Sequence, residues 1–212
     1  RDGQQRGGEQ AVRAVGWMRA MGRRMAAAWF VVGCMVAAGA AAQARVHEVV
    51  LGMRMVPGRA IPEFYFDPMG LFIQPGDTVV FHAVSPHHTV TAYHPAQGKV
   101  QRVPDGVEPF SSPVIPVGIA WSYTFRIPGV YDLWCAPHEM YGMVMRIVVG
   151  EVSGPGAQPS SNFGPDGTFQ VAGRILNHPL LAPQRIVAQG MVPWAAIPEE
   201  AKSLSGGPQA GR

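Results

Sequence analysis

The chain has 212 residues, of which 47% are hydrophobic, so it can bury at least one core. Its 26 glycines and 20 prolines make up roughly a fifth of the residues, which favours short strands and turns over a helical bundle. The formal net charge of +3 does not indicate a nucleic-acid partner, because six of the 17 basic residues precede residue 45 and the remainder has 11 basic and 12 acidic residues.

The first 44 residues are predicted to be an export signal. Arg23 and Arg24 precede an apolar run over residues 25–42, and Ala42-Gln43-Ala44 has the small-x-small form of a signal-peptidase site. We therefore expect cleavage after Ala44 and a periplasmic or extracellular protein. The alternative is a membrane anchor, but the most apolar stretch, residues 26–36, is shorter than the roughly 20 residues that a bilayer requires.

Two variants of the export signal stay open. The arginine pair resembles a twin-arginine signal, and Val31 to Cys34 resembles a lipobox, which would place a lipid anchor on Cys34. If Cys34 leaves with the signal, Cys135 is the only cysteine of the mature chain and cannot form an internal disulfide. A single thiol in an oxidising compartment needs protection by burial or by a metal.

Residues 45–150 are predicted to form an all-β domain, a Greek-key β-sandwich or barrel of about eight strands. Turn signals such as Gln74-Pro75-Gly76-Asp77 separate short runs that are rich in β-branched and aromatic residues. Residues 94–118 contain five prolines, which favours a long crossover with at most one short helix. The expected strands cover residues 47–51, 64–66, 71–73, 78–84, 89–93, 120–127, 130–134 and 143–149.

Residues 151–212 are predicted to form a linker and a C-terminal tail. The composition shifts to Gly, Pro, Ser and Asn up to Gly167, whereas residues 169–197 are apolar again. A short helix is expected over 183–189, and we expect the tail to pack against the sandwich.

One short segment carries the chemistry of the chain. Cys135, His138 and Met143 are separated by two and then four residues, in a loop that is expected to join two strands. Thiolate and imidazole are strong ligands for copper, a thioether is a weak axial one, and one further imidazole would complete a His2Cys plane. This pattern favours a metal site over a buried free cysteine beside a core methionine.

These residues resemble the plastocyanin and pseudoazurin branch of the cupredoxins, whose copper loop has the same Cys-x2-His-x4-Met spacing. The family carries its first ligand in a Pro-His-Asn-Val stretch, and here Pro86-His87-His88-Thr89-Val90 stands at the corresponding place. The resemblance covers about residues 46–150. It implies a cupredoxin fold, one type 1 copper ion cycling between Cu(I) and Cu(II), and the ligands His88, Cys135, His138 and Met143.

The doubled histidine departs from the family pattern. His88 is the preferred ligand because Thr89 and Val90 follow it, with Thr89 where the family's Asn would hydrogen-bond across the site, and His87 remains the alternative. Met140 and Met145 compete with Met143 for the axial role, but the family spacing selects Met143. The remaining histidines are expected at the edge of the core or in solvent: His47, His82, His94 and His178.

The resemblance implies an electron carrier that is monomeric, with redox proteins such as a cytochrome or a copper or haem oxidoreductase as partners. Partners of this family dock on an apolar patch around an exposed ligand histidine, which makes His138 the expected electron exit. An enzyme is not expected, because Trp134 and Ala136 flank Cys135 where multicopper enzymes carry an adjacent histidine, and no His-x-His pair occurs. The alternatives are a copper-delivery protein or a cupredoxin-like accessory domain.

Overall fold

The computed structural model describes residues 43–161 and 168–203. The predicted signal segment lies outside them apart from residues 43 and 44, and so does Cys34. Among the described residues, none of the helices is long and apolar enough to cross a membrane.

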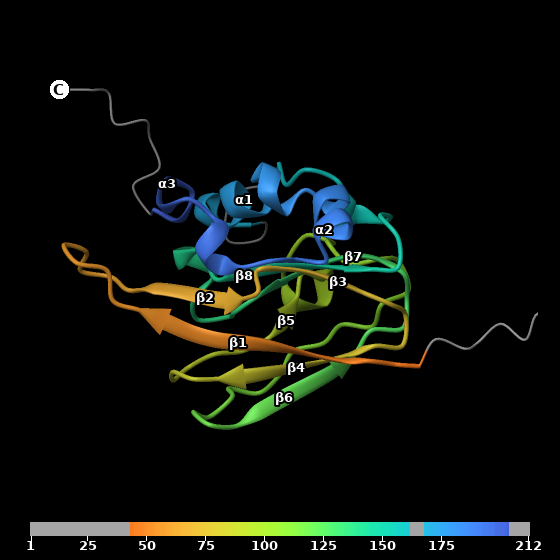
Figure 1. The fold of residues 1–212 in the computed structure, drawn as a ribbon, viewed down its shortest axis with the longest axis horizontal. Helices are drawn as coiled ribbons and strands as arrows, with labels where there is room; N and C mark the ends of the chain where they lie inside the picture. The colour runs from red at the N-terminus through yellow and green to blue at the C-terminus, as the bar shows by residue number, and fades with distance from the viewer. Residues whose placement is uncertain (1–42, 162–167, 204–212) are drawn as a thin grey trace, which may run out of the picture. The chain divides into compact units, whose positions relative to one another are not determined.

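Two sheets pack face to face and enclose the main core (Figure 1). The first sheet has the order β2-β1-β4-β6, with β1 and β4 parallel and the other neighbours antiparallel. The second has the order β5-β7-β8-β3-β9, with β3 and β8 parallel. The strands are β1 (Val46–Arg54), β2 (Glu63–Asp67), β3 (Gly70–Ile73), β4 (Thr78–Ala83), β5 (Thr91–Ala92), β6 (Ala120–Thr124), β7 (Gly129–Trp134), β8 (Val144–Val149) and β9 (Met191–Val192).

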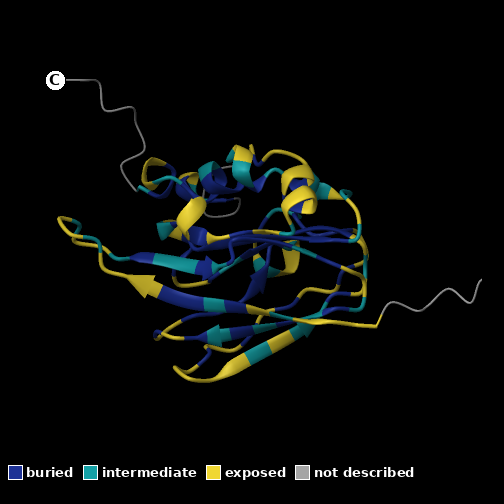
Figure 2. Cartoon of the chain, in the orientation of Figure 1, coloured by how far each residue is buried: buried dark blue, intermediate teal, exposed yellow. Residues whose placement is uncertain are grey.

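Side-chain alternation sets which face of each strand is buried. In β4, Val79, Phe81 and Ala83 face the core, whereas the residues between them are partly exposed, as a period of two requires for a sheet with one solvated face. Every residue of β8 is buried, because this strand lies between the sandwich core and the C-terminal tail (Figure 2). The predicted all-β sandwich is therefore confirmed.

The described part of the tail packs on the outer face of the second sheet and builds a second core, as expected. The predicted helix over 183–189 is α2 (Pro183–Gln189). Three further tail elements were not predicted: α1 (Gln170–Leu176), β9 and α3 (Glu199–Lys202). Short 3-10 helices complete the chain: Pro95–Gln97, Glu139–Tyr141, Pro155–Ala157, Pro179–Leu181 and Trp194–Ala196.

The strand expected over 89–93 is shorter than predicted. Only Thr91–Ala92 pairs with β7, because the chain before it bonds instead to the crossover, with Ile115 N donating to His88 O at 2.9 Å and Ser112 N to Val90 O at 2.9 Å. The crossover itself is irregular apart from the helix at Pro95–Gln97, as expected. These bonds hold the segment containing His88 between β4 and the crossover.

The expectation of a solvated His47 is wrong. Its Nε2 lies 2.8 Å from Oδ2 of Asp77, whose carboxylate is nearly buried in the Pro-Gly turn and also accepts the amides of Arg45 and Gln74. Burial alone would raise the pKa of Asp77, but the hydrogen bonds from these amides and from His47 outweigh it and lower the pKa.

Stability should depend on pH through Asp77. Because its folded-state pKa is depressed, Asp77 contributes stability that is present above the unfolded pKa of about 3.9 and is lost as pH falls through the folded value. Asp77→Asn should therefore lower the free energy of unfolding by roughly 1–2 kcal/mol at neutral pH. In urea unfolding the difference from wild type should shrink below about pH 4; a constant difference from pH 7 to pH 2 would refute this origin.

Candidate metal centre

The loop after β4 presents one histidine to the interior and the next to solvent. His88 is fully buried, and its Nε2 lies 2.7 Å from the Ser85 hydroxyl, which leaves Nδ1 facing inward. His87 is exposed and has a φ of +65°, a left-handed conformation that is uncommon for residues other than glycine. This local turn directs the two adjacent imidazoles apart and brings His88 into the site.

The loop between β7 and β8 carries the other three predicted ligands. Cys135 follows the last residue of β7, and its N–H donates to Met143 O at 3.1 Å, so the loop closes on itself at the base. His138 N donates to Cys135 O at 3.0 Å, and Met143 N donates to His138 O at 3.1 Å. Cys135 and Met143 are fully buried, whereas His138 retains 9% exposure.

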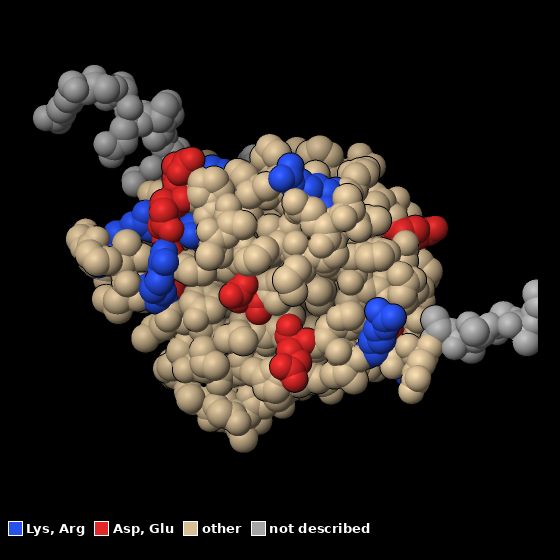
Figure 3. All heavy atoms as spheres, in the orientation of Figure 1, with Lys and Arg blue, Asp and Glu red and all other residues tan. Residues whose placement is uncertain are grey.

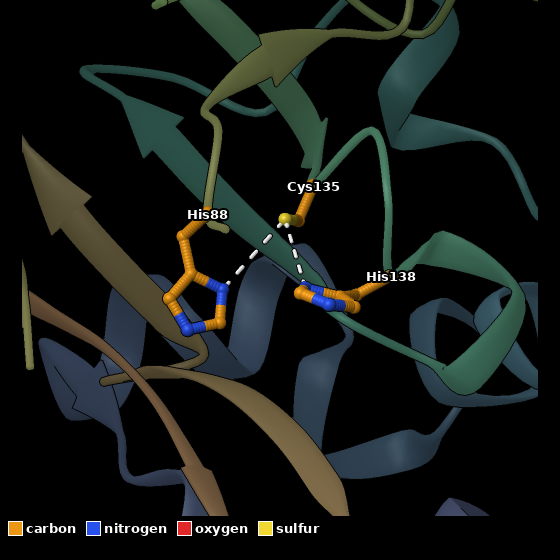
Figure 4. A group of neighbouring side chains, drawn as sticks. All are labelled: His88, Cys135 and His138. Atoms are coloured by element: carbon orange, nitrogen blue, oxygen red, sulfur yellow. Dashed lines mark hydrogen bonds between the residues drawn. The ribbon is translucent and has the colours of Figure 1, made fainter. Parts of the chain in front are cut away.

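Three donor atoms converge at the centre (Figure 4). The Cys135 Sγ lies 3.8 Å from His88 Nδ1 and 3.5 Å from His138 Nδ1, and all three atoms lie within 4.8 Å of one another. A metal with bonds of about 2.0 Å to nitrogen and about 2.3 Å to sulfur, in a trigonal arrangement, would separate S from N by about 3.7 Å. The residues present therefore fit a metal ion with little movement.

The sulfur has a fixed hydrogen-bond environment. Thr89 N donates to Cys135 Sγ at 3.3 Å, and the Thr89 hydroxyl accepts the amide of Ala136 at 2.8 Å, which links the two loops across the site. The expectation that Thr89 would bridge the site is thus met by its Oγ1. An amide donated to a metal-bound sulfur is one of the means by which proteins tune a redox potential.

Burial governs the protonation of the donors. It raises the pKa of Cys135 to about 11, against the lowering effect of the Thr89 amide, and lowers the pKa of His88 and of His138 to about 4 each. Both imidazoles are therefore neutral at pH 7 and available as ligands. The thiol ionises only when a cation is bound, so metal binding releases a proton.

An aromatic side chain covers His138, and sequence reasoning missed it. The Phe64 ring stacks on the His138 imidazole with centroids 3.8 Å apart and an interplanar angle of 8°. Phe64 belongs to β2, and nothing in its neighbourhood along the chain indicates the site. It reaches the loop only because the fold brings β2 against the segment that follows β7.

The remaining candidates stand apart from the three donor atoms. Met145 lies in the core, as expected, and Met140 is about half exposed. His82 and His94 are partly exposed, and His94 caps the short helix at Pro95–Gln97 by accepting the amide of Ala96 at 3.1 Å. His178 accepts the amide of Leu180 at 3.3 Å and so is not simply solvated.

Comparison with known proteins identifies this type of site. Residues 54–150 match the model of the copper binding proteins of the plastocyanin/azurin family. The chain is 33% identical over 117 residues to a putative pseudoazurin from Rhizobium leguminosarum bv. viciae, covering 55% of this chain and 68% of the relative. It is 30% identical over 108 residues to the pseudoazurin of Paracoccus pantotrophus, covering 51% and 66%.

A solved pseudoazurin structure from Sinorhizobium covers 66% of this chain and 98% of its own, with 26% identity and a TM-score of 0.48. The donor set and the matched family model agree on the metal, since two imidazoles, a thiolate and a thioether are typical of blue copper. This chain belongs to the plastocyanin/azurin family of copper-binding proteins, resembles the pseudoazurins within it, and has copper as its cofactor.

Proposed function

We propose that this protein is an exported one-electron carrier whose single type 1 copper is held by His88, Cys135 and His138, with Met143 as the weak axial ligand. The observation that carries the proposal is the buried triangle of Sγ and two Nδ1 atoms, which has the donors and the separations that a trigonal copper site requires. Copper in such a site exchanges one electron between Cu(I) and Cu(II).

The residues of the chain hold the donors still. Ser85 fixes the His88 ring, Thr89 joins the two loops, and Phe64 stacks on His138. With Nδ1 of His88 as a metal ligand, Nε2 would carry the ring proton and would donate a hydrogen bond to the Ser85 hydroxyl. Donors that cannot move impose little reorganisation on a change of charge, and this favours fast electron transfer over substrate chemistry.

Ser85→Ala should test this support. Without the hydroxyl, the buried Nε2 of His88 loses its partner and the ring is free to rotate, so we expect copper affinity to fall by about tenfold. Competition with a chelator of known affinity measures the change. The control is Ser122→Ala, an exposed serine of β6. Affinities that are equal in wild type and Ser85→Ala would contradict the role of Ser85.

The surface beside the His88 loop suits an apolar docking partner. Val84, Val114, Val117 and Ile119 each expose between 54% and 57% of their surface, and we call them the apolar rim. Backbone bonds join their segments, since Ile119 O accepts from Ala83 N and Ile115 bridges to His88. Residues 78–98 and 109–125 contain no Lys, Arg, Asp or Glu.

Charged side chains lie elsewhere at this end of the sandwich. Arg54 and Arg59 on the β1–β2 hairpin form ion pairs with Glu199 of the tail, and Glu63 pairs with Lys202. Figure 3 shows charged side chains near the tip of this hairpin and none at the lower left, over the start of β6. An apolar patch beside the loop of the buried His88 is suited to a brief encounter with a redox protein such as a cytochrome or an oxidoreductase, and the electron exit at His138 stays a prediction.

The start of β1 is compatible with export and processing after Ala44. Arg45 N donates to Asp77 Oδ1 at 2.8 Å, so cleavage before Arg45 would place a new ammonium group on a nearly buried carboxylate and would leave β1 intact. Mass spectrometry of the exported protein should find Arg45 as the first residue. An unprocessed protein in the cytoplasm would contradict this part of the proposal.

Copper delivery is the second candidate function, because the same donors could surrender Cu(I) to another protein. The carrier proposal expects reduced protein to keep its copper in the presence of a moderate Cu(I) chelator over many oxidation cycles. Stoichiometric loss of Cu(I) on the time scale of one reduction would favour delivery.

A further inference from the structure

A buried acid stands inside the metal loop, directly after His138. Glu139 is 1% exposed, and its side chain points away from the donor triangle towards β5 and the tail. Its Oε1 accepts the Tyr93 hydroxyl at 2.7 Å and the Phe169 amide at 3.4 Å. A carboxylate in such a place is costly unless a cation compensates it.

Lys99 supplies that cation from the crossover. Its Nζ lies 2.7 Å from Glu139 Oε2, and both side chains are almost fully buried. The same ammonium lies 4.9 Å from the ring centroids of Trp134 and Phe169, which lie on two different parts of the chain. Trp134 immediately precedes Cys135 and Glu139 immediately follows His138, so the ion pair involves a sequence neighbour of each of these two residues.

Helix α1 contacts the loop at its third ligand. Gly142 precedes Met143 and has a φ of +88°, and a Cβ placed on it would lie 2.8 Å from Ile175 and 3.1 Å from Val171 of α1. The helix therefore packs against the backbone of the loop with no space for a side chain. Each predicted ligand of the loop is therefore adjacent in sequence to a residue that is held in place. Lys99 contacts Trp134 beside Cys135 and Glu139 beside His138. Helix α1 packs on Gly142 beside Met143.

We propose that the Lys99–Glu139 ion pair and α1 form a loop clamp that positions His138 and Met143, so that the tail after Gly150 is part of the copper site. The inference rests on the proposed function, because it assigns these residues to the geometry of that centre. Lys99 and Glu139 are positioning residues and touch no donor atom in the contacts described above.

The clamp depends on the electrostatic attraction between Lys99 and Glu139, whose side chains are both almost fully buried. Displacing His138 from the donor triangle would carry Glu139 with it and would pull its carboxylate from a buried ammonium, where no water replaces the lost interaction. The loop is therefore held against movement when the charge of the bound ion changes. Its effect should be seen in how firmly reduced copper is held and in the spectrum of oxidised copper.

The test compares Lys99→Met with a control, Asp77→Asn, in the full chain. Asp77 is also a buried charged residue, but it lies in the turn before β4 and its hydrogen bonds go to Arg45, His47 and Gln74. Each substitution removes the charge from one buried contact, so both should lower the unfolding temperature of copper-free protein. Lys99→Arg keeps the charge and serves as the rescue.

Lys99→Met should release Cu(I) to a chelator about tenfold faster than wild type and change the visible absorption and electron paramagnetic resonance of the Cu(II) form. Asp77→Asn should match wild type in both, and Lys99→Arg should restore both. Glu139→Gln, which keeps the size of the side chain, should resemble Lys99→Met.

The clamp would be overturned if Lys99→Met lowered the unfolding temperature, as Asp77→Asn does, and yet kept the wild-type release rate and spectra, because Lys99 would then be merely structural. A failure of the proposed function gives a different result. In that case wild type itself would lack an intense thiolate-to-copper absorption, whatever the variants did.

Discussion

Cys135→Ser is expected to abolish the intense visible absorption of the copper-loaded protein and to lower its copper affinity by more than about 100-fold, the upper range for outer-shell changes. Cys135 provides the only sulfur among the three converging donor atoms, and its Sγ is the atom that both imidazoles approach. A hydroxyl is a hard, neutral donor that does not replace a thiolate for copper. Visible spectroscopy and a metal competition assay measure the two effects.

Met145→Leu is the matched control, since this buried residue lies two positions beyond Met143 in the same core and the substitution conserves volume. It should keep both absorption and affinity. His87→Gly should keep them as well, because His87 is exposed and glycine adopts its positive φ without strain. An intense absorption in Cys135→Ser, or its loss in His87→Gly, would contradict the ligand assignment.

Asp132→Asn is expected to lower the free energy of unfolding by about 3–5 kcal/mol, the largest stability effect that we predict. Asp132 is fully buried in β7, where its carboxylate accepts Arg146 Nε and Arg102 Nε, each at 2.7 Å. Arg146 also donates to Leu176 O and Leu181 O, so this cluster joins the sandwich to the tail. The neutral amide would leave two buried guanidinium groups without a counter-charge.

Urea unfolding of the copper-free full chain measures this difference. The control is Asp105→Asn, an exposed residue of the crossover, which should change stability by no more than about 0.5 kcal/mol. If the free energy of unfolding of Asp132→Asn were within about 1 kcal/mol of the wild-type value, the charge cluster would not be what fixes the tail to the sandwich.

Much of the sandwich could be predicted, because its strands repeat apolar residues at period two between Pro-Gly turns. β4 is an example, with Val79, Phe81 and Ala83 all in the core. The convergence of Cys135 and His138 could be predicted as well, since they lie in one short loop, whereas their role as ligands with Met143 stays a prediction. The structure was needed to choose between His87 and His88, because the left-handed conformation at His87 determines which of the two imidazoles points into the site.

The surroundings of the site could not be predicted in the same way. Phe64, Lys99 and Phe169 reach the metal loop from distant positions in the chain, and their contacts follow from strand pairing and tail packing. β9 contains only two residues, which is too short for a recognisable hydrophobic pattern, and it is stabilised by pairing with β3. Local patterns indicate elements and ligands, whereas contacts between distant segments follow only from the fold.

The central claim is that one copper ion at His88, Cys135, His138 and Met143 exchanges electrons and stays bound. The most direct measurement is a spectroelectrochemical titration of the copper-loaded full chain, with copper content determined before and after repeated cycles. We predict an intense absorption that bleaches on addition of one electron per protein, returns on oxidation, and leaves the copper content unchanged. A protein without that absorption, or one that loses its copper on the first reduction, would contradict the claim.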